Sequence, residues 1–257
     1  MPDRAPNTAA PATLAAEGLT KSFGGLTAVR DVTLTLNLHE WHAVIGPNGA
    51  GKSTFVNLLS GELPPSSGRI LLEGRDVAGL PAWRMAHLGV GRSFQRTNVL
   101  KPLTVMENVR LAAQAVRLPA RRLLRAPLRE RELVDVAQRA LTHVGLGWAA
   151  GKIAGVLSHG AQRQLEIAMT LAIDPKVLLL DEPLAGMGQE EGERMATLLK
   201  TLARDHAVLL IEHDMDFVFK VADVMTVLVE GAVLATGKPA DVRANKTVQS
   251  AYLGAHA

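Results

Sequence analysis

Hydrophobic positions follow two different periods along this chain, and the change of period divides it into three stretches. In the first, from about residue 14 to 95, apolar residues form short runs separated by glycine and proline turns. Val32–Leu36 alternates between apolar and polar residues, Ala43–Ile45 is apolar throughout, and Arg69–Glu73 is a further β-like run. Such runs are typical of strands, so this stretch is predicted to be rich in β-structure.

The middle stretch, from about residue 103 to 150, has a helical period. Thr104 and Glu107 have the spacing of a capping box, which predicts that a helix starts there and runs toward Val116. Over residues 130–144, apolar residues then recur every three or four positions. They are Leu133, Val136, Ala137, Ala140, Leu141 and Val144.

From residue 177 onward, apolar strands alternate with helical patterns. Continuous apolar strands joined by helices indicate a parallel sheet covered on both faces, so we expect an α/β fold. The predicted elements are strands at Val177–Leu180, Val208–Ile211 and Val224–Val229, helices near 189–204 and 214–221, and a short hairpin return from Gly231 to Thr236.

The composition excludes some classes of protein. The chain has 257 residues, 47% of them hydrophobic and 21% charged, which suits one large globular domain. The absence of cysteine excludes disulfides and thiolate metal sites, and a net charge of +3 does not by itself indicate nucleic-acid binding. No apolar run reaches the ~18–20 residues that span a bilayer. We expect a soluble intracellular protein whose residues 1–13, rich in proline and alanine, form a disordered tail.

The sequence from residue 46 to 54 is Gly-Pro-Asn-Gly-Ala-Gly-Lys-Ser-Thr, directly after the apolar run Trp41–Ile45. It matches the phosphate-loop pattern Gly-x4-Gly-Lys-[Ser/Thr] between a strand and a helix. Its glycines let backbone N–H groups converge on an anion, and the following helix adds its positive dipole end. Lys52 would reach the β- and γ-phosphates, and the Ser53 hydroxyl would bind Mg²⁺. The predicted nucleoside triphosphate site consists of Gly46, Pro47, Asn48, Gly49, Ala50, Gly51, Lys52, Ser53 and Thr54.

Val177–Leu180 is followed by two carboxylates, Asp181 and Glu182. In phosphate-loop enzymes a strand beside the loop carries an aspartate at its carboxyl end, which holds Mg²⁺ through its water shell. Asp181 fits this role, and Glu182 would face the γ-phosphate and orient or deprotonate the attacking water. An ordinary strand before an acidic turn is the alternative, and the phosphate loop makes it the weaker one.

Taken in order, these motifs resemble those of the ATP-binding subunits of ABC transporters, over about residues 14 to 254. The resemblance implies a single ATPase domain over residues 14–257 with an α/β fold. That fold comprises a phosphate-loop NTPase core with a mainly parallel sheet, an N-terminal antiparallel β subdomain, and a helical subdomain at about residues 97–173. It also implies that the ligands are ATP and Mg²⁺ and that the activity is ATP hydrolysis.

The resemblance assigns further residues to the site. Phe23, in Lys-Ser-Phe-Gly-Gly, resembles the aromatic residue that stacks on adenine, although a packing phenylalanine is nearly as compatible with the sequence. Gln95 resembles the glutamine that senses Mg²⁺ and the attacking water, which makes it a predicted metal ligand together with Ser53 and Asp181. His213 resembles the switch histidine, which hydrogen-bonds the γ-phosphate and holds the water and the catalytic glutamate.

The stretch Leu-Ser-His-Gly-Ala-Gln around Ser158 resembles the family signature Leu-Ser-Gly-Gly-Gln at a helix N-terminus. In a head-to-tail pair of subunits, Ser158 and Gly160 would contact the nucleotide bound by the other subunit. The chain departs from this motif at His159 and Ala161. It also departs at Gly188, where the family usually has Asp or Asn in a loop that crosses the dimer interface.

Several segments are most similar to the ATPases of bacterial branched-chain amino acid importers and of the related urea and amide importers. These segments are residues 23–29, 181–187, 211–215 and 251–254. The resemblance implies the motor subunit of an importer, bound peripherally at the cytoplasmic face of the inner membrane. Its partners would be two integral-membrane permease subunits, a second ATPase subunit (a paralogue or another copy) and, indirectly, a solute-binding protein, with no nucleic acid.

Other functions stay open at this point. They are the ATPase of a lipopolysaccharide exporter, a soluble ATP switch of the same superfamily acting on ribosomes or DNA, and a regulatory module without turnover. The chain lacks a second such domain and a long coiled-coil insert, which argues against the switch. Its complete set of Lys52, Asp181, Glu182 and His213 argues against the module. The arginine-rich segment Arg117–Glu132 is expected to be a solvated loop, with a contact to anionic lipid or a partner as the alternative.

Overall fold

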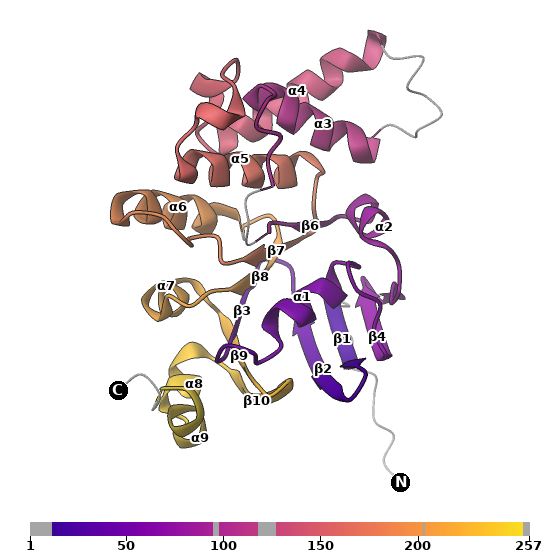
Figure 1. Ribbon diagram of the computed structural model, residues 1–257, viewed down its shortest axis with the longest axis vertical. Helices are drawn as coiled ribbons and strands as arrows, with labels where there is room; N and C mark the ends of the chain where they lie inside the picture. Colours follow the sequence, from indigo (N-terminus) through magenta and orange to yellow (C-terminus); the bar gives the residue numbers. More distant parts are fainter. Residues whose placement is uncertain (1–11, 95–97, 118–126, 203, 254–257) are drawn as a thin grey trace, which may run out of the picture.

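The protein is built on a six-stranded sheet and a four-stranded sheet (Figure 1). The computed structural model describes residues 12–94, 98–117, 127–202 and 204–253. The larger sheet has the order β10-β9-β3-β8-β7-β6, and its neighbours are parallel except β10, which returns antiparallel to β9. Its strands are β3 (Trp41–Ile45), β6 (Val90–Arg92), β7 (Val177–Asp181), β8 (Ala207–Ile211), β9 (Val224–Val229) and β10 (Ala232–Gly237).

The smaller sheet is antiparallel and comes from the N-terminal part of the chain. Its order is β2-β1-β4-β5, with β1 (Leu14–Phe23), β2 (Leu26–Leu36), β4 (Ser67–Leu72) and β5 (Arg75–Asp76). The prediction of an α/β core with a mainly parallel sheet and an N-terminal antiparallel β region is therefore confirmed. Residues 1–11 of the predicted tail lie outside the described residues, and Thr13 is buried.

The central strands are buried on both faces because their sequences are continuously apolar. Every residue of β7 and β8 is buried. Since successive side chains of a strand point to opposite faces, Leu178 and Leu180 belong to one apolar cluster and Leu179 belongs to another. The first cluster contains residues of α3 to α7, and the second contains residues of α1 and the antiparallel sheet.

Helices cover both faces of the larger sheet (Figure 1). They are α1 (Lys52–Leu59), α2 (Ala82–His87), α3 (Val105–Arg117), α4 (Pro127–His143), α5 (His159–Ala172), α6 (Gln189–Leu202), α7 (Met215–Val221), α8 (Pro239–Ala244) and α9 (Lys246–Val248). Short turns of helix lie at η2 (Gly147–Ala149), η3 (Ala154–Val156) and η4 (Gln249–Leu253). In these described residues, no helix has the length and hydrophobicity needed to cross a membrane.

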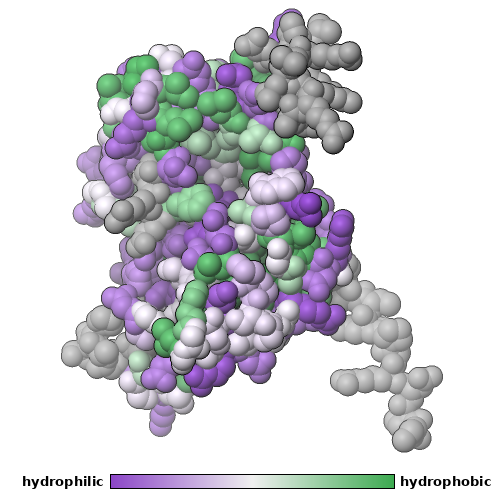
Figure 2. Space-filling model, turned by 45° about the vertical axis from the view of Figure 1, so that its right-hand side comes forward, coloured by the Kyte–Doolittle hydropathy of each residue, from purple (hydrophilic) through white to green (hydrophobic). Residues whose placement is uncertain are grey.

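Helices α3, α4 and α5 pack together at one end of the molecule, in the region predicted to be the helical subdomain (Figure 1). The boundaries predicted for it, at about residues 97 and 173, stay a prediction. Hydrophobic surface gathers on this end (Figure 2), and the connections beside the helices expose Leu100, Trp148, Ile153 and Val156.

The loop predicted from Arg117 to Glu132 needs a correction. Helix α4 already begins at Pro127, so the second part of this segment is helical. Proline is favoured at a first helical position because its missing N–H would have no partner there and its φ is already helical. Residues 118–126 of the segment lie outside the described residues.

The capping box at the start of α3 forms as predicted. The backbone N–H of Glu107 donates to Oγ1 of Thr104 at 3.1 Å, and the backbone N–H of Thr104 donates to Oε2 of Glu107 at 2.8 Å. The bond from the N–H of Thr104, together with one from its hydroxyl at 2.8 Å, lowers the pKa of Glu107.

We expect Thr104→Ala to destabilise the fold by about 1 kcal/mol, because it removes an N-cap acceptor. In a chain of this size the melting temperature should fall by ~2–4 °C. The matched control is Thr197→Ala in α6, where the hydroxyl bonds only to a carbonyl within its own helix. Thermal unfolding of the two variants measures the difference, and equal shifts would contradict the capping role.

Candidate functional site

The loop between β3 and α1 is the centre of the candidate site, and its glycines adopt conformations that other residues avoid. Gly46, Gly49 and Gly51 have φ values of +152°, +79° and +95°. A Cβ atom at Gly46 would lie 2.1 Å from the carbonyl oxygen of Leu228, and one at Gly51 would lie 2.2 Å from that of Ala28. Both positions therefore require glycine, in agreement with a loop that curls tightly around an anion.

Lys52 begins α1, and its side chain lies back across the loop. It is buried, and Nζ donates to the carbonyl oxygens of Gly46 (2.6 Å) and Pro47 (3.0 Å). Burial lowers the pKa of Lys52, while the charges of Glu182 and Asp181 act to raise it. The ammonium group thus lies near Asp181 at the end of β7 and Glu182 just after it. In the rest of the loop, Asn48 and Ser53 are exposed, Thr54 is partly buried and Ala50 is buried.

Asp181 is a buried carboxylate at the end of β7. Burial raises its pKa, and the Arg92 guanidinium, whose Nη2 lies 3.7 Å from Oδ2 of Asp181, opposes that rise. The backbone N–H of Asp181 donates to Oγ of Ser93 at 3.4 Å. Additional positive charge beside this carboxylate would be favourable, because its charged form is poorly solvated.

Glu182 and His213 follow the carboxyl ends of two adjacent parallel strands, and their side chains meet. Nε2 of His213 lies 2.8 Å from Oε1 of Glu182. The His213 side chain is 44% exposed and that of Glu182 is 18% exposed, so solvent reaches the pair. The backbone of Glu182 has a φ of +48°, and its N–H donates to the carbonyl oxygen of Ile211 at 2.9 Å.

Ser158 caps the N-terminus of α5. Its Oγ accepts a hydrogen bond from the N–H of Ala161 at 3.2 Å and donates to Oε1 of Glu191 in α6 at 3.1 Å. The Glu191 carboxylate also covers Gly160, where a Cβ atom would lie 2.8 Å from its Cδ. Among the described residues, no hydrogen bond or ion pair joins Ser158 or Gly160 to the 46–54 loop. The structure therefore does not unite the two predicted parts of the nucleotide site within one chain.

Phe23 lies at the end of β1 with 46% of its surface exposed, and Nζ of Lys21 is 5.2 Å from the centre of its ring. The β1–β2 hairpin that carries it is anchored beside the loop, because Ala28 of β2 abuts Gly51. Gln95, the remaining predicted site residue, lies outside the described residues.

Several polar residues that organise the site were not predicted from the sequence. One is Glu212, which is buried just before His213. Its carboxylate accepts from the N–H of Leu184 (2.9 Å) and the N–H of His213 (3.0 Å), and so joins the ends of β7 and β8. Burial raises the pKa of Glu212, and these hydrogen bonds oppose the rise. A carboxylate ending an apolar strand was the available signal, since the same signal identified Asp181.

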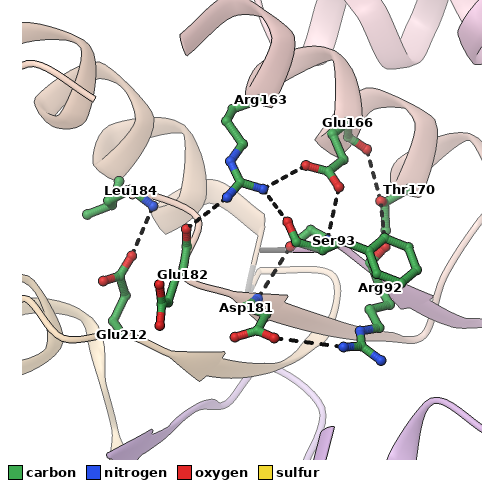
Figure 3. A network of polar contacts seen from close by, with 10 residues as sticks. Arg92, Ser93, Arg163, Glu166, Thr170, Asp181, Glu182, Leu184 and Glu212 are labelled. Carbon is green, nitrogen blue, oxygen red and sulfur yellow. Dashed lines mark hydrogen bonds and ion pairs between the residues drawn. The ribbon is translucent and has the colours of Figure 1, made fainter. Parts of the chain in front are cut away.

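A second group of missed residues lies between α5 and β7 (Figure 3). Arg163 and Glu166 form an ion pair with 2.9 Å between Nη1 and Oε2. Thr170 Oγ1 donates to the carbonyl oxygens of Glu166 (2.9 Å) and Arg92 (3.3 Å). The bond from Thr170 to Arg92 ties α5 (the signature helix, capped by Ser158) to β6, the strand that leads toward Gln95.

Comparisons with known proteins show which proteins this chain resembles. A family model described as ABC transporter matches residues 29–185, and one described as branched-chain amino acid ATP-binding cassette transporter matches residues 232–257. BraF of Pseudomonas aeruginosa, a high-affinity branched-chain amino acid transport ATP-binding protein, is 41% identical over 249 residues. The similarity covers 94% of this chain and 97% of BraF.

Solved structures give the same fold. The ADP conformation of an ATP-binding cassette of an ABC transporter superposes with a TM-score of 0.81 at 28% identity, covering 94% of this chain and 98% of that one. A dimeric post-hydrolysis cassette bound to ADP and Pi superposes with a TM-score of 0.75 at 25% identity, covering 88% and 98%.

Proposed function

Because the chain belongs to the ABC transporter ATP-binding family, we propose that it is the ATP-hydrolysing subunit of an importer for branched-chain amino acids or related small polar solutes such as urea or amides. The observation that carries the ATPase assignment is the contact between Glu182 and His213 beside the buried Lys52. The similarity to BraF along nearly the whole chain favours import over lipopolysaccharide export or an ATP switch on ribosomes or DNA.

In this proposal the loop amides and Lys52 bind the phosphates of ATP, and Phe23 stacks on the adenine. Ser53 and Asp181 would hold Mg²⁺, with Gln95 as a further ligand. The donor set fits this ion, because Mg²⁺ binds oxygen ligands and Asp181 is a buried carboxylate. Its pKa is raised by burial despite the nearby Arg92, so a further cation would stabilise its charged form. When bound, the ion would neutralise charge on the β- and γ-phosphates.

Glu182 is the proposed catalytic residue. It orients the attacking water and accepts a proton from it, and His213 keeps the carboxylate in place through the 2.8 Å contact. The remaining acceleration comes from Lys52 and the loop N–H groups, which stabilise charge on the transferring phosphoryl group.

A second subunit completes the site in this proposal. Ser158 and Gly160 of one subunit would cover the γ-phosphate bound by the other, whether that other subunit is a copy or a paralogue. The solved dimeric relative supports such pairing. In the single chain, the Glu191 carboxylate already lies on this helix N-terminus, where it would repel a phosphate.

Glu191→Ala is therefore expected to make ATP-driven pairing easier. Removing a like charge beside a phosphate is worth on the order of 1 kcal/mol, so about fivefold less ATP should give half-maximal dimer. The readout is the dimer mass by light scattering during an ATP titration, in a background that carries Glu182→Gln. Glu190→Ala is the matched control, since Glu190 lies in the same first turn of α6 but is ion-paired with Arg194. If both changes shift the titration equally, Glu191 has no specific role in pairing.

A groove offers a place for the membrane partner. A cavity of about 310 Å³ lies between α2, β6 and α5. Its lining combines apolar residues such as Trp83, Met169 and Ile173 with the charged Arg92 and Glu166. Trp83 is 60% exposed at this groove. We assign the groove to a cytoplasmic helix of a permease subunit, because large exposed aromatic residues next to a cavity suit a protein partner.

The test is gentle affinity purification of the tagged chain from detergent-solubilised membranes of its own cell, with the companions identified by mass spectrometry. We expect two multi-span permeases, a second ATPase subunit if the pair is a heterodimer, and a solute-binding protein. Recovery of ribosomal or DNA-associated proteins without a permease would overturn the transport function but leave the ATPase assignment intact.

Matched variants locate the contact. Trp83→Glu should abolish recovery of the permeases, whereas Trp148→Glu, at a tryptophan that is 65% exposed outside the groove, should not. Equal recovery with both variants would reject the groove as the permease site.

A further inference from the structure

Arg163 is a buried cation that contacts three parts of the site at once. Its side chain is 3% exposed, and it lies in α5 one turn after Ser158. The guanidinium donates to the carbonyl oxygen of Phe94, to Oε2 of Glu166 at 2.9 Å and, through Nη2, to the carbonyl oxygen of Glu182 at 3.3 Å (Figure 3). One side chain therefore connects the signature helix, the segment before Gln95 and the end of β7.

Glu166 completes the arrangement around Phe94. Its Oε1 accepts from the backbone N–H of Phe94 at 2.9 Å, while Arg163 holds the carbonyl oxygen of the same residue. Both polar groups of one peptide segment are thus held by one ion pair. Phe94 and Glu166 also line the groove assigned above to the permease.

The backbone of Glu182 depends on such support. A residue with a Cβ atom at a φ near +48° costs roughly 1–2 kcal/mol and persists where surrounding contacts hold it there. At Glu182 the carbonyl oxygen accepts from Nη2 of Arg163 and from the N–H of Ala185 (3.1 Å), and the N–H donates to Ile211. From this backbone the Glu182 side chain reaches His213, with 2.8 Å between Oε1 and Nε2.

We propose that Arg163, paired with Glu166, is a positioning residue that holds Glu182 in its catalytic conformation and links it to the permease groove. The proposal rests on the proposed function, in which Glu182 acts on the attacking water. A partner in the groove would touch Phe94 and Glu166. Arg163 bonds to both of these residues and to the carbonyl oxygen of Glu182, so it would carry their displacement to Glu182.

A purely structural role of the ion pair predicts that apolar residues can replace it without loss of ATP turnover. Replacing a buried ion pair by well-packed apolar residues is often neutral or stabilising, whereas removing one partner leaves a costly buried charge. An apolar pair can fill the space of Arg163 and Glu166, but it cannot donate to the carbonyl oxygens of Phe94 and Glu182. The positioning role and the purely structural role can therefore be distinguished in a variant that lacks the ion pair but stays folded.

The experiment compares steady-state ATP hydrolysis and nucleotide binding for the full chain as isolated from its own cells. The variants are the double change Arg163→Met/Glu166→Met and the single change Arg163→Lys. We expect the double variant to stay folded, with a lowered melting temperature because the backbone of Phe94 loses its side-chain partners. It should keep its nucleotide affinity while kcat falls by on the order of ten- to a hundredfold. Arg163→Lys should give an intermediate kcat, since lysine keeps the charge but lacks the planar fork that reaches several acceptors.

The matched control is Glu73→Gln/Lys176→Gln, which removes an exposed ion pair of 2.6 Å elsewhere and should leave kcat unchanged. The proposal is overturned if the double variant keeps the wild-type kcat, or if kcat and nucleotide affinity fall together. Its failure is distinguishable from failure of the proposed function, because in the latter case the wild-type chain itself would not hydrolyse ATP or would not bring down a permease.

Discussion

Glu182→Gln is expected to abolish most ATP turnover while leaving ATP binding intact. The amide keeps the shape of the side chain and its hydrogen bond to Nε2 of His213, but it cannot accept a proton from water. The loss of a general base lowers kcat by about 10²- to 10⁴-fold. Because the nucleotide is then not consumed, the two subunits should stay together in an ATP-bound dimer. Phosphate release and the mass of the complex in ATP and Mg²⁺ measure the two effects.

Glu230→Gln is the control for this change. Glu230 is an exposed glutamate with a φ of +49°, so it reproduces the backbone conformation of Glu182 without its contacts. It should behave as wild type in both assays. A Glu182→Gln chain that stays monomeric and turns over ATP at the normal rate would refute the catalytic role.

Lys52→Ala is expected to remove most nucleotide affinity. Lys52 is buried, and its Nζ lies near Asp181 and Glu182. The phosphates of ATP would add negative charge beside these two carboxylates, and the lysine charge would offset it. A hydrogen bond to a charged group is worth about 1.5–3 kcal/mol, so the dissociation constant should rise by roughly ten- to a hundredfold or more. Titration with a fluorescent ATP analogue measures it.

Two checks make the Lys52 result interpretable. Lys176→Ala, which removes an exposed lysine paired with Glu73, should not change nucleotide affinity. Thermal unfolding should show that the Lys52→Ala chain is folded, since its Nζ also holds the loop carbonyls of Gly46 and Pro47. Unchanged ATP binding by a folded Lys52→Ala chain would remove the phosphate-loop assignment.

The sequence predicted well the elements whose signals are local. The apolar runs of β7 and β8, the capping box at Thr104 and the hairpin return after Gly231 depend on neighbouring residues alone, and all are confirmed. Strand β1 was not predicted individually. Its period is interrupted at Gly18, where the pairing register with β2 shifts. Strand β6 was also missed, because three residues are too few to show a period.

The residues of the candidate site likewise fall into a group that the sequence predicted and a group that it did not. The phosphate loop and the strand-end carboxylates have fixed spacings, so the sequence could identify them, although their roles stay predictions. Arg163, Glu166 and Glu191 have no such spacing. Arg163 meets Phe94 and Glu182, which are 69 and 19 positions away, and Glu191 meets Ser158 from 33 positions away. Contacts of this kind appear only once the helices are packed.

The left-handed backbone at Glu182 has a consequence for anyone who would make this protein more robust. Glycine adopts that conformation without steric strain, so a redesign that optimises thermostability alone would favour glycine at position 182. The same choice would delete the carboxylate on which turnover is proposed to depend. Thermal stability and ATP turnover thus favour different residues at this position, and the natural chain has the residue suited to turnover.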